Sequence, residues 1–255
     1  MNPIKTVLYR IYERRLLREV SSGRKPRHLG VILDGNRRFA IERGMGHLWG
    51  HEKGYENVEK LLQWCLDLGI QELTLFAFST ENFTRPPEEV EALMDLLVRA
   101  CERLAVDPTI HSNRVKVRAI GRLELLPERL RSAIARAQDA TREYDGMHLN
   151  IALSYGGRAE IIDAIKRIYR KVSAGELSID AVDENVVGQH LYKEAMPDPE
   201  MIIRTSGEMR LSGFLLWQSA YSELYFADAY FPDFRKVDFI RAVRTFQQRE
   251  RRFGR

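Results

Sequence analysis

Short apolar runs alternate with longer amphipathic stretches along most of the chain. Six of these runs have the length and composition of strands: HLGVIL (28–33), ELTLFAF (72–78), RVKVRAIG (114–121), HLNIALSY (148–155), EMIIRTSG (200–207) and SELYFAD (222–228). Several of them are apolar at consecutive positions, which is typical of strands buried on both faces of a parallel sheet.

The stretches between these runs have apolar residues at three- and four-residue spacing, which predicts helices. Prolines and acids begin one of them and a glycine ends another, as expected at helix ends. The predicted helices cover residues 54–69, 86–104, 127–144, 158–172 and 237–253. The alternation predicts an α/β fold, an open and mostly parallel sheet flanked by helices. Because no linker-like change of composition interrupts it, we expect residues 28–255 to form a single domain.

A basic amphipathic segment precedes the first strand. Its apolar residues recur at helical spacing, with basic side chains between and beyond them: Ile4, Val7, Leu8, Ile11, Tyr12, Leu16 and Leu17, then Lys5, Arg10, Arg14, Arg15 and Arg18. This pattern is typical of a helix on a membrane surface, and equally of a helix packed on the protein with its basic face in water. The sequence SSGRKP then ends the helix, so residues 1–27 are predicted to be an arm.

Composition limits the function classes only mildly. The formal net charge of +4 is too small to predict nucleic-acid binding, although arginine supplies 31 of the 40 basic side chains. Arginine grips phosphate with two parallel hydrogen bonds, but genomic base composition would also explain the excess. The two cysteines, Cys65 and Cys101, lie in helical patterns among apolar neighbours. We therefore expect a cytoplasmic protein, with peripheral contact to a membrane left open.

Arginine-bearing loops follow four of the predicted strands. The loops are DGNRR (34–38), STENFTR (79–85), YGGR (155–158) and RTSGEMRLS (204–212). In open α/β sheets, ligands bind beyond the carboxyl ends of the strands. Glycine, asparagine and serine are ordinary turn residues, but a turn does not require arginine. The loops therefore predict a pocket for a polyanion, held by arginines and by backbone N–H groups at a helix N-terminus.

Asp34 is the exception within this cationic pocket. A carboxylate is expected there if a divalent cation bridges it to the anion, as in a magnesium-bound diphosphate. A plain turn would explain the sequence DGN if it stood alone. The chain has no P-loop, dinucleotide-binding or zinc motif. His47 and His51 lie four residues apart without a third metal ligand, which favours hydrogen bonding or core packing.

An apolar region adjoins the predicted pocket. The run LTLFAF leads directly into the loop at 79–85, and the next helix carries apolar residues on one face: Val90, Leu93, Met94, Leu97 and Cys101. Core packing would explain this face, and so would an apolar tunnel that begins at the anion pocket. A ligand with an apolar tail and a diphosphate head is an isoprenoid.

Four segments carry a resemblance to a known family. LDGNRRFA, FSTENFTRP, LNIALSYGGR and RTSGEMRLSGFLLWQSAYSELYF resemble segments of the cis-prenyltransferases, the undecaprenyl diphosphate synthase family, from about His28 to Arg255. The resemblance implies a homodimer with a hydrophobic tunnel. It also implies a Mg²⁺-dependent transferase that adds isopentenyl diphosphate repeatedly to an allylic diphosphate, geranylgeranyl or farnesyl, with cis double bonds. The products would be long-chain polyprenyl diphosphates for lipid glycosyl carriers.

The resemblance also assigns roles to individual residues. It places the magnesium-bound allylic diphosphate in a cage made by Asp34, Gly35, Asn36, Arg37 and Arg38, with His51 assisting. It assigns a loop that orders over the substrates to Ser79, Glu81, Asn82 and Arg85, with Asn82 relaying protons or positioning the reacting groups. It assigns the binding of isopentenyl diphosphate to Arg204, Arg210 and Ser212. Glu223 would complete magnesium binding from across the dimer interface.

Three departures from many bacterial members bear on the primer. Arg37 stands in place of a glycine, Met209 in place of a histidine and Gly213 in place of an asparagine. DGNRR and RTSGE look more like archaeal and eukaryotic members, which favours geranylgeranyl diphosphate. A non-catalytic partner subunit is the alternative, although such relatives lack the cage sequence that is complete here. An RNA-binding domain would need exposed aromatic residues among the arginines. The aromatic residues of this chain fall mainly in the apolar strands and helices, so no nucleic-acid partner is expected.

Overall fold

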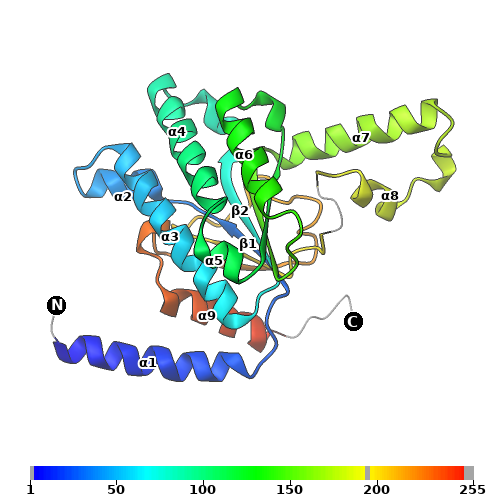
Figure 1. Cartoon of the computed structure of the whole chain (residues 1–255). Helices are drawn as coiled ribbons and strands as arrows, with labels where there is room; N and C mark the ends of the chain where they lie inside the picture. Colours follow the sequence, from blue (N-terminus) through cyan, green and yellow to red (C-terminus); the bar gives the residue numbers. More distant parts are fainter. Residues whose placement is uncertain (1–2, 193–195, 250–255) are drawn as a thin grey trace.

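Six parallel strands form one open sheet in the computed structural model, which describes residues 3–192 and 196–249, with side chains from residue 11 onward (Figure 1). In spatial order the strands are β3 (Val115–Ile120), β4 (Met147–Tyr155), β2 (Glu72–Ser79), β1 (His28–Ile32), β5 (Met201–Arg204) and β6 (Glu223–Phe226). Each pairs with its neighbour in parallel. The predicted α/β fold with a mostly parallel sheet is confirmed.

The strand order brings the arginine-bearing loops together. The strands β4, β2, β1 and β5 are consecutive neighbours in the sheet, and they are the four strands that these loops follow. Because the strands are parallel, all four loops leave the sheet at the same edge.

The predicted helices form close to their expected positions. They are α3 (His47–Leu68), α4 (Pro87–Leu104), α6 (Glu128–Ala140), α7 (Gly157–Ser173) and α9 (Lys236–Gln248). The largest differences are that α3 begins seven residues before the expected start at residue 54, and that α6 ends four residues before the expected end at residue 144. The expected continuation of the last helix beyond residue 249 lies outside the described residues. The sequence analysis missed three short helices, α2 (Asn36–Glu42), α5 (Pro108–Ser112) and α8 (Glu184–Gln189). Each has two turns or fewer, too short to show a helical period.

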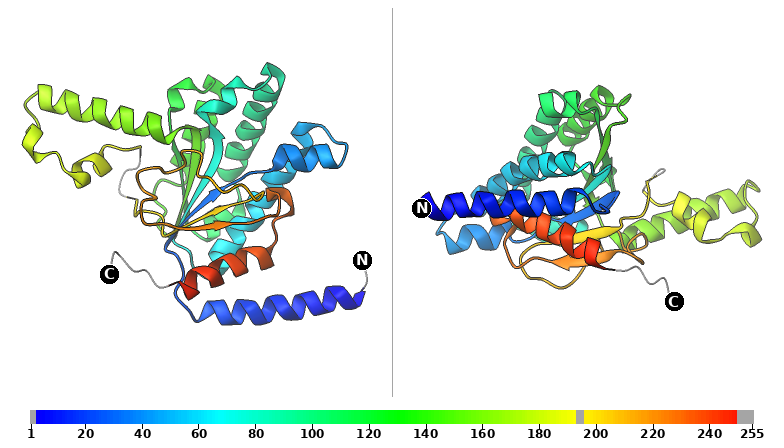
Figure 2. Two further views of the ribbon diagram at one scale, coloured as in Figure 1. Left: turned by 180° about the vertical axis from the view of Figure 1, so that it is seen from behind. Right: turned by 90° about the horizontal axis from the view of Figure 1, so that it is seen from below.

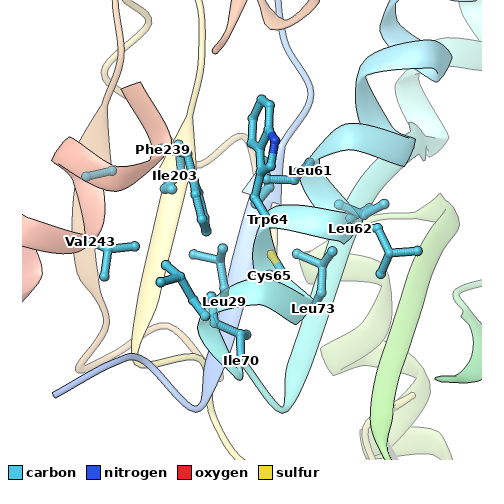
Figure 3. Packing of buried hydrophobic residues seen from close by; sticks show 14 of the residues in the cluster. Leu29, Leu61, Leu62, Trp64, Cys65, Ile70, Leu73, Ile203, Phe239 and Val243 are labelled. Atoms are coloured by element: carbon cyan, nitrogen blue, oxygen red, sulfur yellow. The ribbon is translucent and has the colours of Figure 1, made fainter. Parts of the chain in front are cut away.

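The main core lies between one face of the sheet and the helices α3 and α9. Figure 3 shows Trp64 and Cys65 of α3 and Phe239 of α9 packed around Leu29 and Leu73 of the sheet. All five side chains are buried. This packing fixes the first two strands, and therefore the loops that follow them.

The opposite face of the sheet carries the segment that follows β5. The Phe214 ring stacks on Phe76 with centroids 5.0 Å apart, and it also covers Gly30. A Cβ atom at Gly30 would lie 3.0 Å from the Phe214 ring, so glycine leaves room for this segment to approach β1. The packing places the neighbouring residue Ser212 near the carboxyl edge of the sheet.

The N-terminal segment forms the helix α1 (Pro3–Ser21), which lies alongside α9 (Figures 1 and 2). Leu16 and Val20 are buried in the main core, and the Gln247 amide donates a 2.8 Å hydrogen bond to the Val20 carbonyl. The end of the helix therefore packs on the protein, while Ile11 is 58% exposed. None of the helices in the described part of the chain is long and apolar enough to cross a membrane.

Candidate active site

A cleft of about 820 Å³ lies at the carboxyl edge of the sheet, where the four loops meet. Residues from all four loops line it: Asp34, Asn36, Ser79, Thr80, Glu81, Asn82, Arg85, Gly156, Gly157, Arg158, Arg204 and Ser212. His51, from the second turn of α3, lines it as well. The structure therefore brings together most of the residues that the sequence analysis selected.

A glycine turn positions the acidic residue of the cleft. Gly35 has φ 101° and ψ 0° and forms the N-cap of α2. A Cβ atom there would lie 2.6 Å from the Tyr230 ring and 3.1 Å from the Tyr230 backbone. Both the backbone conformation and the packing therefore require glycine. The turn sets Asp34 at the end of β1 and begins α2 at Asn36, so that Arg38 lies on the first turn of the helix.

Asp34 forms an ion pair with an almost fully buried arginine. Its Oδ2 atom accepts hydrogen bonds from Arg204 Nη2 at 2.7 Å and Nε at 3.2 Å. Arg38 Nη2 lies 3.4 Å from the other carboxylate oxygen. Burial alone would raise the pKa of Asp34, but the hydrogen bonds and charges of these arginines hold it below its ordinary value. The side chain is therefore a carboxylate at neutral pH.

Arg204 connects the first-strand loop to the loop after β5. Besides Asp34, its guanidinium contacts Ser212 Oγ at 2.8 Å and the Arg210 carbonyl oxygen. Arg210 itself is exposed and pairs with Glu208, which also accepts a 2.9 Å hydrogen bond from Arg38. The residues predicted for the two diphosphate sites therefore adjoin each other, with Arg204 between them.

A second charged cluster lies beside the cleft, centred on Glu89 of α4. Its Oε1 atom is 3.1 Å from Arg85 Nη1, 3.4 Å from Arg37 Nε and 3.5 Å from His51 Nε2. Burial and the nearby Arg85 charge lower the pKa of His51 to about 4, so the imidazole is neutral at pH 7. The sequence analysis did not select Glu89. Its position four residues after Arg85, on the first turn of a helix, was the available signal.

The loop after β2 closes on itself. The Ser79 backbone N–H donates a 2.9 Å hydrogen bond to Asn82 Oδ1, which caps the short 3₁₀ turn Thr80–Thr84. Glu81 is exposed at the cleft. In this arrangement the Asn82 amide oxygen holds the loop, and only a rearrangement of the loop would free it for the reacting groups.

Glu223 lies away from the cleft within one chain. It begins β6, in register with Met201 of β5 and, through it, with Leu29 of β1. Asp34 lies five residues beyond Leu29, about 16 Å further along the strand direction. Glu223 instead pairs with Arg249 at 2.6 Å. The described residues contain no group of three acidic, histidine or cysteine side chains placed to hold a metal.

An apolar cavity of about 260 Å³ opens from the cleft between α3, α4 and the sheet. The two spaces share Leu33, Asn36, His51, Ala77 and Leu93. Beyond them, the cavity wall consists mainly of apolar side chains: Val58, Leu62, Leu75, Leu96, Leu97, Leu149 and Ile151. An anion cleft that continues into an apolar cavity is suited to a ligand with a diphosphate head and a hydrocarbon tail.

Comparison with known proteins agrees with this geometry. The family described as putative undecaprenyl diphosphate synthase matches residues 32–254. An isoprenyl transferase of Thermus thermophilus is 55% identical over 252 residues, 97% of this chain and 96% of its own. A tritrans,polycis-undecaprenyl-diphosphate synthase (geranylgeranyl-diphosphate specific) of Methanopyrus kandleri is 54% identical over 248 residues, 97% of this chain and 92% of its own.

Among solved structures, lavandulyl diphosphate synthase from Lavandula x intermedia, in complex with dimethylallyl diphosphate, superposes with a TM-score of 0.85. It is 37% identical and covers 93% of this chain and 100% of its own. A probable undecaprenyl diphosphate synthase from Campylobacter jejuni superposes with a TM-score of 0.75. It is 35% identical and covers 91% of this chain and 100% of its own. The chain therefore belongs to the undecaprenyl diphosphate synthase family of prenyltransferases.

Proposed function

We propose that the protein condenses isopentenyl diphosphate repeatedly onto an allylic prenyl diphosphate, with each new double bond cis. The product would be a long-chain polyprenyl diphosphate for lipid glycosyl carriers. One observation carries this proposal: the cleft around Asp34 and Arg204 continues into an apolar cavity between α3 and α4. The head of the primer would lie in the cleft, and its tail in the cavity.

The residues of the cleft fit a magnesium ion that arrives with the substrate. Mg²⁺ in phosphate sites is usually held by one or two carboxylates, with phosphate oxygens and waters completing its shell. Asp34 supplies one carboxylate, ionised and 27% exposed. The bound ion would neutralise charge on the leaving diphosphate.

The arginines of the cleft are suited to an ionising reaction. Loss of the allylic diphosphate puts negative charge on the leaving group, and donors fixed in advance stabilise that charge most effectively. Arg204 is held by Asp34 and Ser212 before substrate binds. Two adjoining anion sites would also hold the two substrates next to each other, which lowers the entropic part of the barrier.

Relatives support geranylgeranyl diphosphate as the primer. Several of the most similar proteins, from Methanopyrus, Pyrococcus and Thermoplasma, are named as geranylgeranyl-diphosphate specific. The test is incubation of the purified protein with isopentenyl diphosphate, Mg²⁺ and each allylic primer, followed by analysis of product length. A non-catalytic partner subunit would give no product, but the assembled cage around Asp34 favours the enzyme.

We also propose a homodimer. The helix α7 extends away from the body together with α8 (Figures 1 and 2). Three large apolar side chains on one stripe of α7 are exposed, Ile162, Ile165 and Tyr169. A second copy of the chain that covered this stripe would remove it from water. Such a partner would also be the means by which Glu223 approaches a cleft.

A peripheral contact with the membrane is proposed for α1. The basic side chains along this helix and the exposed Ile11 favour binding to an anionic lipid surface. The enzyme would work on the cytoplasmic side, because both cysteines are free thiols buried in the structure, which is typical of a reducing compartment.

A further inference from the structure

A serine with a strained backbone lies beside the carboxylate of the cleft. Ser206, in the loop after β5, has φ 75°, in the left-handed region that favours glycine. Gly207 follows it with φ 72°, and a second glycine at position 206 would have formed the same turn without strain. A residue held in such a conformation at a functional site suggests that its side chain has a role there.

The backbone of Ser206 is fixed without help from the side chain. Its N–H donates a 2.7 Å hydrogen bond to the Ala229 carbonyl, and the N–H of Gly207 donates one of 2.8 Å to the Ala227 carbonyl. The residue is 8% exposed and packs against the first-strand turn, where a Cβ atom at Gly35 would lie 3.0 Å from the Ser206 Cβ. Removing the hydroxyl should therefore leave the loop in place.

The Ser206 hydroxyl accepts a hydrogen bond from Arg38. Arg38 Nη2 lies 2.7 Å from Ser206 Oγ, but 3.4 Å from Asp34 Oδ1. The other terminal nitrogen of this guanidinium, Nη1, donates to Glu208 at 2.9 Å. Both hydrogen bonds from Arg204 to the carboxylate go to its second oxygen, Oδ2. The oxygen more open to a cation is therefore Oδ1.

The serine stands between a guanidinium and the carboxylate with which it would otherwise pair. Burial raises the pKa of Asp34, whereas the arginines and a hydrogen bond from Ser206 lower it. A neutral hydroxyl beside a carboxylate can rotate its proton away when a cation arrives. A guanidinium paired directly with the same oxygen keeps its charge there and repels the cation.

We infer that Ser206 is a positioning residue that keeps Arg38 away from Asp34 Oδ1 and so leaves this oxygen open to the magnesium ion of the bound diphosphate. The inference rests on the proposed function, in which that ion arrives with the substrate. Without the hydroxyl, Asp34 Oδ1 is the nearest remaining acceptor for Arg38 Nη2 among the described residues, and the guanidinium moves onto it. The ion must then displace a charge-assisted hydrogen bond, which raises the Mg²⁺ concentration that binding requires.

Two serine variants test the inference through binding of the magnesium diphosphate. Ser206→Gly removes the hydroxyl and relieves the backbone, and Ser206→Ala removes the hydroxyl alone. Ser154→Ala is the matched control, because Ser154 is also buried with a positive φ of 48°, and its hydroxyl has no hydrogen-bond partner in the described part of the chain. Each full-length protein is melted with geranylgeranyl diphosphate and increasing Mg²⁺, without isopentenyl diphosphate, so that no condensation occurs.

The Mg²⁺ concentration that gives half of the rise in melting temperature should increase roughly three- to ten-fold in both Ser206 variants, which corresponds to about one hydrogen bond. Ser154→Ala should match the wild type. In assays with isopentenyl diphosphate, turnover should require more Mg²⁺ by the same factor, and excess Mg²⁺ should restore it. In an Arg38→Gln background, Ser206→Gly should cause no further shift, because the guanidinium that the hydroxyl holds is absent.

An unchanged midpoint in both Ser206 variants, an equal shift in Ser154→Ala, a further shift in the Arg38→Gln background, or turnover that excess Mg²⁺ does not restore would overturn the inference. So would a wild type whose melting temperature does not respond to Mg²⁺ in the presence of the primer. If Ser206→Ala fails to fold, Ser206→Gly decides the test, since glycine suits the left-handed backbone. A wild type that binds the magnesium diphosphate but makes no polyprenyl product would instead refute the proposed function.

Discussion

At the scale of single residues, the proposed chemistry of the cleft depends on Asp34 and Arg204. They form a hydrogen-bonded ion pair between the first- and fifth-strand loops, and Arg204 is only 4% exposed. Removing one member of such a pair leaves the other buried without compensation. A substitution at either position therefore changes the charge of the cleft and, separately, the stability of the protein.

Asp34→Ala should lower turnover by orders of magnitude, because it removes the carboxylate proposed to receive the magnesium diphosphate. It should also lower the melting temperature, since Arg204 loses its partner. Asp34→Asn keeps a hydrogen-bond acceptor for Arg204, so it should lose turnover to a similar degree with a smaller loss of stability. Steady-state assays across a magnesium titration, with thermal unfolding in parallel, separate the two effects. Near-normal turnover in either variant would refute the assignment.

Replacing Arg210 and replacing Arg204 should have different effects on the kinetics of the two substrates. Arg210 is exposed and lies in the fifth-strand loop alone, so Arg210→Ala should chiefly raise KM for isopentenyl diphosphate. Loss of a charge-assisted contact costs about 1.5–3 kcal/mol, roughly ten- to a hundred-fold. Arg204→Ala should weaken the use of both substrates, because Arg204 also holds Asp34. Arg210→Lys should rescue partly, since an ammonium cannot form the two-pronged contact.

Kinetics with each substrate varied in turn would distinguish these outcomes. If Arg210→Ala raised KM for the primer alone, the assignment of that loop to isopentenyl diphosphate would be reversed.

The sequence indicated some residues of the site better than others. Asp34 and the arginines stood out because charge is unusual directly after apolar strands. Glu89 did not, because an acid on the first turn of a helix is ordinary, and only the fold brings it within 3.5 Å of Arg37 and His51. The role of Arg204 as a link between loops depends on strand adjacency, which local sequence does not contain.

At the scale of elements, the N-terminal helix illustrates an ambiguity that the pattern alone could not resolve. Apolar residues at helical spacing are compatible with a membrane surface and with a packed helix. Leu16 and Val20 are buried against the protein, whereas Ile11 is exposed. The packed-helix interpretation therefore holds for the end of α1, and the membrane-surface interpretation stays a prediction for the turn around Ile11. Whether residues 1–27 act as a separate arm stays a prediction.

The arm should bind anionic vesicles. Full-length protein should co-sediment with vesicles of phosphatidylglycerol and phosphatidylcholine, and binding should weaken as salt rises from low to physiological concentration. Because the buried end of α1 supports the fold, the comparison should use charge substitutions at Arg14, Arg15 and Arg18 rather than deletion. Undiminished binding of that triple variant would exclude the arm as the lipid contact.

The exposed stripe of α7 should be a contact between copies. In sedimentation at micromolar concentration we expect a dimer, and Ile165→Asp should shift it toward monomer by burying a charge in the contact. Lys171→Glu is a control on the same helix, because Lys171 is exposed and lies about 180° around the helix from Ile162. A monomeric wild type, or a dimer unaffected by Ile165→Asp, would contradict the proposal.

At the scale of the whole molecule, the class of fold followed from the alternation of strands and helices, but the strand order did not. The order β3-β4-β2-β1-β5-β6 depends on crossovers that no local pattern specifies. The apolar face of α4 likewise allowed core packing or a tunnel. Its residues do both: Met94 is buried in a core cluster, while Leu93 and Leu97 line the cavity.

The central claim is that this protein extends an allylic diphosphate with isopentenyl units. The most direct measurement is incorporation of radiolabelled isopentenyl diphosphate in the presence of Mg²⁺ and geranylgeranyl diphosphate, with product length and double-bond geometry determined afterwards. The account predicts long-chain polyprenyl diphosphates whose new double bonds are cis, slower incorporation with farnesyl diphosphate, and almost none with Asp34→Asn. Folded wild-type protein that incorporates no label with either primer, at any magnesium concentration, would contradict it.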